Sequence, residues 1–144
     1  MPTVKEVLND TKKRLKEQGI DTYSLDSSLL VSEVTGLTKI QLVTHDRDEV
    51  TEEQINRLEN LVKERLKNKP MQYILGHCEF MGLDFKVTEN TLIPRGDTEN
   101  IVEEVIATIE NSGYNTVLDM CTGTGAIAIS VAHYTKAKVT ASDI

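Results

Sequence analysis

The stretch D-M-C-T-G-T-G at residues 119–125 contains the residue types of a loop that binds a nucleoside cofactor. Its glycines, Gly123 and Gly125, stand between an apolar run typical of a buried strand and one typical of a helix. Glycine lets the backbone approach a ligand closely, and the N-terminus of the following helix offers free amide groups. Asp143 ends the next strand-like segment, where an acid can accept hydrogen bonds from ribose hydroxyls. Together these residues predict a binding site for an adenosine-containing cofactor.

Two classes of cofactor fit this loop. Gly123, Gly125 and Ala128 match the dinucleotide pattern G-x-G-x-x-A, with an acid about twenty residues further on. Asp119 favours the other class, because a carboxylate directly before the loop repels a pyrophosphate but not the ammonium and sulfonium groups of S-adenosylmethionine. The pattern D-x-x-x-G-x-G therefore favours S-adenosylmethionine, and an NAD-linked dehydrogenase remains as the less favoured alternative.

The segments around the loop predict a strand at 115–120, a helix at 125–134 and a second strand at 137–143, which is a strand–helix–strand unit of a parallel sheet. Upstream, apolar residues at helical spacing predict a helix that ends at Gly113, with Asp97 or Thr98 as its N-cap. The residues expected on its buried side are Ile101, Val102, Val105 and Ile109. Such sheets usually contain about five or more strands. We therefore expect the chain to be cut off within its second domain.

Residues 1–70 have the periodicity and punctuation of a helical domain. Two capping boxes, Thr3 with Glu6 and Thr51 with Gln54, predict two helix starts. The expected ends of the three longer helices are Gly19, Gly36 and Pro70. After Pro70 the pattern changes, and residues 71–93 predict a β-hairpin that links this domain to a second domain at 94–144. The β-formers of the hairpin are Tyr73, Ile74, Phe80, Phe85 and Val87.

Composition excludes several classes of protein. The net charge is −7, and residues 71–144 carry 4 Lys and Arg against 10 Asp and Glu, which disfavours direct binding of nucleic acid. No apolar run approaches the ~20 residues of a membrane span and no signal segment begins the chain, so we expect a cytoplasmic protein. The cysteines form no C-x-x-C pattern and the histidines stand singly, so no metal site is expected. These residues are Cys78, Cys121, His45, His77 and His133.

Four segments carry a family pattern. They are R-L-K-N-K-P-M-Q-Y-I-L-G-H-C-E-F-M-G-L-D-F-K-V (65–87), L-I-P-R-G-D-T-E (92–99), V-L-D-M-C-T-G-T-G-A-I-A-I-S (117–130) and A-S-D-I (141–144). In order and spacing they closely resemble the HemK/PrmC family, the peptide chain release factor glutamine N5-methyltransferases. The resemblance covers essentially the whole chain. It implies a multi-domain fold with an all-α N-terminal helical bundle, a β-hairpin linker and the incomplete start of a Rossmann-like α/β class I methyltransferase domain.

The resemblance also implies a cofactor, a substrate and a set of site residues. The cofactor is S-adenosylmethionine, and the substrate is the glutamine side chain of the Gly-Gly-Gln motif in class I peptide chain release factors. The positions that match the cofactor site are Asp119, Cys121, Thr122, Gly123, Thr124, Gly125 and Asp143. Within the family's I-P-R-P-D-T-E segment, Arg95, Thr98 and Glu99 are expected to support either the site or the scaffold.

Three departures from the family pattern bear on function. Gly96 replaces the usual proline, and Cys121 replaces the usual first glycine of the loop, which costs stability if that position needs a positive backbone angle. The family's Asn-Pro-Pro-Tyr motif, which holds the substrate amide, does not occur in these 144 residues. We therefore expect no catalytic residues and no methyl transfer from this chain alone.

Two further expectations concern partners. The alternative to an enzyme is a non-catalytic helical protein-binding module, in which residues 1–70 dock a release factor. The exposed strand edge of an incomplete sheet also predicts self-association or partial disorder of the second domain.

Overall fold

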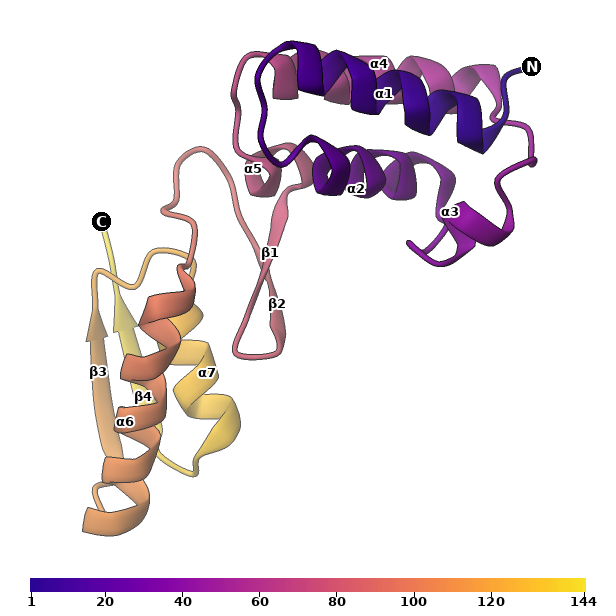
Figure 1. The fold of residues 1–144 in the computed structure, drawn as a ribbon. Helices are drawn as coiled ribbons and strands as arrows, with labels where there is room; N and C mark the ends of the chain where they lie inside the picture. The colour runs from indigo at the N-terminus through magenta and orange to yellow at the C-terminus, as the bar shows by residue number, and fades with distance from the viewer. The chain divides into compact units, whose positions relative to one another are not determined.

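A computed structural model describes residues 1–144. The chain forms two compact units, Met1–Leu75 and Gly76–Ile144 (Figure 1). The first unit is entirely helical, and all four strands of the protein lie in the second. No helix is both long and apolar enough to cross a membrane.

The two amphipathic helices of the helical unit each begin with the predicted capping box. The helices are α1 (Val4–Glu17), α2 (Tyr23–Thr35), α3 (Gln41–Thr44), α4 (Glu52–Leu66) and α5 (Met71–Leu75). Thr3 and Glu6 cap α1 reciprocally, and Thr51 and Gln54 do the same for α4, which confirms both predicted starts. Gly36 ends α2 in a left-handed conformation (φ 74°), as its position predicted.

An aliphatic core joins the five helices of this unit. Its fully buried members are Val4, Leu15, Leu30, Val31, Val50 and Val62. One ion pair is buried beside the core: Arg65 Nε on α4 donates to Asp26 Oδ2 on α2 over 2.8 Å, and their side chains are 15% and 5% exposed. Thr22 Oγ1 also donates to Asp26 Oδ2, so the carboxylate is well satisfied in the interior.

The prediction of β-structure from residue 71 onward was wrong for its first residues. Tyr73 and Ile74 lie in the short helix α5, and the hairpin begins only at His77. Ile74 packs against the helical core, because burial there outweighs the strand preference of a β-branched side chain.

The second unit contains a hairpin, two helices and a pair of parallel strands. Its elements are β1 (His77–Phe80), β2 (Leu83–Lys86), α6 (Gly96–Ser112), β3 (Thr116–Met120), α7 (Ala126–Tyr134) and β4 (Lys138–Ser142). Strands β1 and β2 are antiparallel, and β3 and β4 are parallel with α7 as the connection. The predicted strand–helix–strand segment is therefore confirmed as local structure.

Helices α6 and α7 cover one face of the parallel pair (Figure 1). The core between them contains Phe80, Phe85, Val102, Ala126 and Val131. On the opposite face of β3, Leu118 and Met120 are 60% and 69% exposed. This face of the sheet is therefore uncovered in the 144 residues, and two large apolar side chains on it are exposed.

Helix α6 starts differently from the sequence-based expectation. Its N-cap is Arg95, whose side chain makes no capping hydrogen bond, and Asp97 and Thr98 lie inside the first turn. The predicted cap at Asp97 or Thr98 was wrong by two or three residues. Asp97 and Glu99 instead place negative charge beside the positive end of the helix dipole, which also stabilises a helix start.

Candidate functional site

The glycine loop lies between the end of β3 and the start of α7, beside the end of β4. The parallel register pairs Asp119 with Ala141 and Met120 with Ser142, so both strands end at the same edge. Thr122 N donates to Ser142 O over 3.0 Å and joins the loop to the end of β4. Because of this register, Asp143 lies directly against the loop although it is twenty residues away from Gly123.

The Asp119 carboxylate faces into the loop and fastens it. Its Oδ2 accepts from Thr122 Oγ1 at 2.6 Å and from Ala128 N, in the first turn of α7, at 3.2 Å. One of the free amide groups at the start of α7 is thereby already satisfied by a carboxylate. An anion bound at this helix terminus would have to approach that negative charge.

The Asp143 carboxylate borders the loop from the β4 side. Its Oδ2 accepts from Gly123 N at 2.6 Å and its Oδ1 from Ile144 N at 2.7 Å. The hydrogen bond from Gly123 N, followed by that from Ile144 N, lowers the pKa of this carboxyl below its ordinary value. Asp143 is therefore a charged, solvent-exposed acceptor beside the glycines.

The loop backbone adopts left-handed angles at three positions. Gly123 (φ 60°) and Gly125 (φ 82°) do so without strain, and a Cβ at Gly125 would lie 3.0 Å from Ile129 Cδ1. Cys121 has φ 60° and carries a side chain in the same region. Because this φ angle is positive, the backbone at Cys121 is strained, as the sequence-based expectation stated for a positive angle.

A cavity of about 230 Å³ lies between the loop and the segment that precedes α6. Its lining residues are Phe80, Leu92, Ile93, Pro94, Arg95, Thr98, Cys121, Thr122, Gly123, Thr124, Ala126 and Ile127. Arg95 is the only charged residue among them, and its guanidinium makes no hydrogen bond or ion pair in the structure. The cavity thus brings Arg95 and Thr98 together with the loop, from positions more than twenty residues upstream.

Not all the predicted site residues line this cavity. Asp119, Gly125 and Asp143 border the loop on its strand and helix sides instead. Glu99 points to the hairpin, where its Oε1 accepts from Met81 N at 2.9 Å. Six lining residues were not among the predicted site residues: Phe80, Leu92, Ile93, Pro94, Ala126 and Ile127. The most distant of them from the loop along the chain is Phe80, which was predicted only as a strand residue of the hairpin. Its place just before a glycine-containing turn was the available signal, but its partners are distant in the chain.

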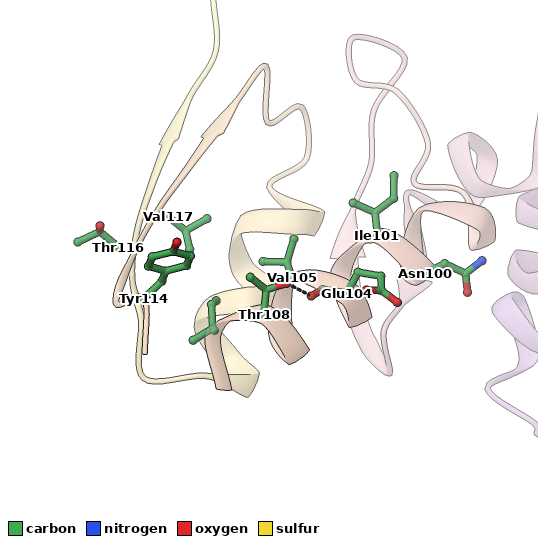
Figure 2. Close-up of a pocket in the computed structure, with 9 residues that line it drawn as sticks. Asn100, Ile101, Glu104, Val105, Thr108, Tyr114, Thr116 and Val117 are labelled. Carbon is green, nitrogen blue, oxygen red and sulfur yellow. Dashed lines mark hydrogen bonds between the residues drawn. The ribbon is translucent and has the colours of Figure 1, made fainter. Parts of the chain in front are cut away.

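A larger groove of about 460 Å³ lies away from the loop, along α6 and the start of β3 (Figure 2). Ile101, Val105, Ile109, Tyr114 and Val117 supply most of its apolar wall, and Glu104 is its only charged residue. Ile101 was predicted to lie on the buried side of its helix, which was wrong: it is 57% exposed and lines this groove. No group of three or more His, Cys, Asp or Glu side chains gathers as a metal site in either unit.

Comparison with known proteins gives a consistent family. Residues 6–76 match the PrmC N-terminal domain. The chain is 42% identical over 142 residues to a release factor glutamine methyltransferase of Clostridium acetobutylicum, an alignment that covers 98% of this chain and 50% of that protein. It is 38% identical over 143 residues to that of Moorella thermoacetica, which covers 99% of this chain and 50% of the relative.

The same name belongs to a relative from Fusobacterium nucleatum, 40% identical over 141 residues, with 96% of this chain and 40% of that protein covered. The chain thus spans about half the length, or less, of the curated relatives it matches. The chain thus carries a PrmC-type N-terminal domain and is similar along nearly all of its 144 residues to proteins named release factor glutamine methyltransferase.

Proposed function

We propose that this chain provides the S-adenosylmethionine-binding loop of a methyltransferase whose substrate is the glutamine side-chain amide in the Gly-Gly-Gln motif of class I release factors. The observation that carries the proposal is the position of the two acids at the loop, Asp119 and Asp143, combined with the names of the relatives. The start of the Rossmann-like domain is part of the same proposal, and β3, α7 and β4 form its first parallel unit.

The hydrogen bonds at the loop favour S-adenosylmethionine over NAD. A pyrophosphate needs free amide groups at the glycines and at the start of the helix. Here Asp119 accepts from Ala128 N and Asp143 accepts from Gly123 N, so carboxylates already lie at both places. A sulfonium and an ammonium group gain from the same negative charges.

The cavity and the loop suggest which residue binds which part of the cofactor. Asp143 accepts from the ribose hydroxyls beside the glycines. Arg95, the unpaired cation of the cavity, binds the carboxylate of the cofactor's amino acid part, and Thr98 and the Cys121–Thr124 backbone lie beside it. Glu99 supports the site indirectly, through the hairpin.

Methyl transfer to an amide needs more than a bound cofactor. A glutamine amide nitrogen is a poor nucleophile, so it must be held in line with the sulfonium by acceptors that draw electron density onto nitrogen. The 144 residues contain no Asn-Pro-Pro-Tyr sequence to do this. The proposal therefore assigns cofactor binding to this chain, docking of the release factor to the helical unit, and orientation of the amide to residues outside the 144.

Calorimetric titration of the 144-residue chain with S-adenosylmethionine and with NAD tests the cofactor assignment. We expect binding of S-adenosylmethionine only, and a loss of roughly 10-fold or more in Asp143→Ala, because a charge-assisted hydrogen bond is lost. Asp84→Ala is the matched control, since Asp84 is an exposed acid of the hairpin outside the cavity. Binding of NAD in preference to S-adenosylmethionine would favour the dehydrogenase alternative.

Transfer of labelled methyl groups to a purified release factor tests the division of labour. We expect transfer by a full-length relative and none by the 144-residue chain. Methylation by the chain alone would contradict the assignment of amide orientation to other residues. Release factor binding without any cofactor binding would favour the helical protein-binding module.

A further inference from the structure

The turn of the hairpin is anchored to two helices through a single residue. Met81 and Gly82 form the two-residue turn between β1 and β2, and both have positive φ angles (51° and 72°), as in a type I′ turn. Met81 N donates to Glu99 Oε1 on α6 at 2.9 Å, and Met81 O accepts from Tyr134 Oη on α7 at 2.6 Å. Both polar groups of this one backbone unit are therefore held by side chains.

The adjoining residue, Phe80, connects this anchor to the candidate site. Its side chain is 1% exposed, packs edge-on against Phe85 with ring centroids 6.2 Å apart, and lines the 230 Å³ cavity. It also belongs to the same core cluster as Ala126, the first residue of α7 after the loop. Because Phe80 directly precedes Met81, a shift of the turn moves the one part of the hairpin that reaches the cavity.

The two side chains that anchor the turn come from distant parts of the chain, which a hairpin turn does not require. A two-residue hairpin of this type is compatible with its own geometry and needs no outside partner. Glu99 and Tyr134 come from 18 and 53 residues along the chain, and Tyr134 lies at the last residue of α7, at the opposite end of that helix from the loop. A side chain at position 82 would also lie close to Tyr134, whose Oη is 3.5 Å from the Cβ site of Gly82.

We propose that Glu99 and Tyr134 are positioning residues that hold the hairpin turn so that Phe80 forms a wall of the cofactor cavity. The inference rests on the proposed function only in that the cavity is taken to bind S-adenosylmethionine. Neither side chain lines the cavity, so each acts through Met81 and Phe80. The hairpin is thus a structural part of the cofactor site.

The test compares Tyr134→Phe, which removes only the hydroxyl, with Thr135→Val in the 144-residue chain. Thr135 is the matched control because it is the adjoining residue, and its hydroxyl donates to Val131 O and accepts from Ala137 N, with no contact to the hairpin. Amide chemical shifts measured by NMR need no ligand. We expect Tyr134→Phe to shift the amides of Phe80 and of residues 121–124, whereas Thr135→Val shifts neither group.

The second measurement is the affinity for S-adenosylhomocysteine, the reaction's demethylated cofactor product. We expect roughly fivefold weaker binding in Tyr134→Phe and in Glu99→Ala, as for the loss of one hydrogen bond, and unchanged binding in Thr135→Val. In a Phe80→Leu background, Tyr134→Phe should have no further effect, because the residue through which it acts is gone.

The outcomes separate this inference from the proposed function. Unchanged loop amides in Tyr134→Phe, or an equal loss of affinity with and without Phe80, would overturn the positioning role even if S-adenosylhomocysteine binds well. Shifted loop amides in a chain that binds no S-adenosylhomocysteine would support the positioning role and contradict the cofactor assignment instead.

Discussion

Cys121 occupies a backbone conformation that suits glycine. Its φ of 60° lies in the left-handed region, and the family that the chain resembles has glycine at this position. The thiol itself is exposed and free. The departure from the family pattern therefore acts through the Cβ atom and not through sulfur chemistry.

Cys121→Gly is expected to stabilise the protein by about 1 kcal/mol, because the clash of Cβ with the backbone is removed. The free energy of unfolding, measured by urea denaturation, tests this. Cys121→Ala is the control, since it removes the thiol and keeps Cβ, and it should leave stability nearly unchanged. An equal gain from both variants would show that the thiol, and not the backbone angle, is the source of the cost.

Asp119 is the residue whose role the structure refined most. Its position before the loop predicted an electrostatic preference for a cationic cofactor. The structure adds that the carboxylate fastens the loop, through Thr122 Oγ1 and Ala128 N. The same charge can serve both purposes, because a carboxylate at a helix N-terminus stabilises the helix and occupies the site of a competing anion.

At the scale of single elements, the first position of α6 has the geometry that proline requires, although glycine occupies it. Gly96 is the first residue of the helix, its N–H has no acceptor, and a Cβ there would meet no atom within 4 Å. Arg95 before it has φ −106° and ψ 146°, which is the extended conformation that a residue before proline prefers. Helices favour proline at this first position.

We expect Gly96→Pro to raise the free energy of unfolding by roughly 0.4–1 kcal/mol, by reducing the freedom of the unfolded chain. Thr98→Pro, two residues later, should instead lower it, because Thr98 N donates to Arg95 O at 3.0 Å. Thermal unfolding of both variants measures the contrast. A loss of stability in Gly96→Pro would mean that the helix does not start at Gly96.

The buried ion pair between α2 and α4 is the polar contact on which the helical unit depends most. Asp26→Ala leaves Arg65 inside the unit without its charged partner, and we expect a loss of roughly 3–5 kcal/mol. Glu33→Ala breaks a second pair between the same two helices, Glu33 with Arg57 at 2.8 Å, but Arg57 is 57% exposed. That variant should cost less than about 1 kcal/mol. Similar losses in the two variants, measured by denaturant unfolding, would contradict the assigned difference in burial.

At the scale of the whole molecule, the parallel pair is a sheet with an unpaired edge. Strand β3 pairs only with β4, and its uncovered face carries the exposed Leu118 and Met120. Exposed apolar side chains beside a free strand edge make the edge a template for another chain. Relatives about twice as long have further residues that this chain does not contain.

The 144-residue chain alone is therefore expected to self-associate with increasing concentration, and Leu118→Lys is expected to reduce this. Sedimentation velocity over a range of concentrations provides the measurement. Val43→Lys is the control, because this substitution adds the same charge on the helical unit, where Val43 is 74% exposed. A chain that stays monomeric throughout, or equal effects of the two lysines, would contradict association through β3.

Much of the structure could be predicted because its signals are local. The capping boxes at Thr3 and Thr51 and the helix end at Gly36 depend on hydrogen bonds and backbone angles within a few residues. The loop at 121–125 was equally predictable, since glycines between a strand and a helix satisfy a local requirement. By itself the sequence determined the order of the elements, the glycine loop and the family pattern.

Only the tertiary structure decided which side chains meet. The exposure of Ile101 depends on what packs against α6, and the helical state of Ile74 depends on the core below α5. The cavity unites Phe80, Arg95 and the loop, and the hairpin turn is held by Glu99 and Tyr134, 18 and 53 residues away. The physical reason is that such contacts join segments distant in the chain, and their energies exceed local preferences only once the elements have packed.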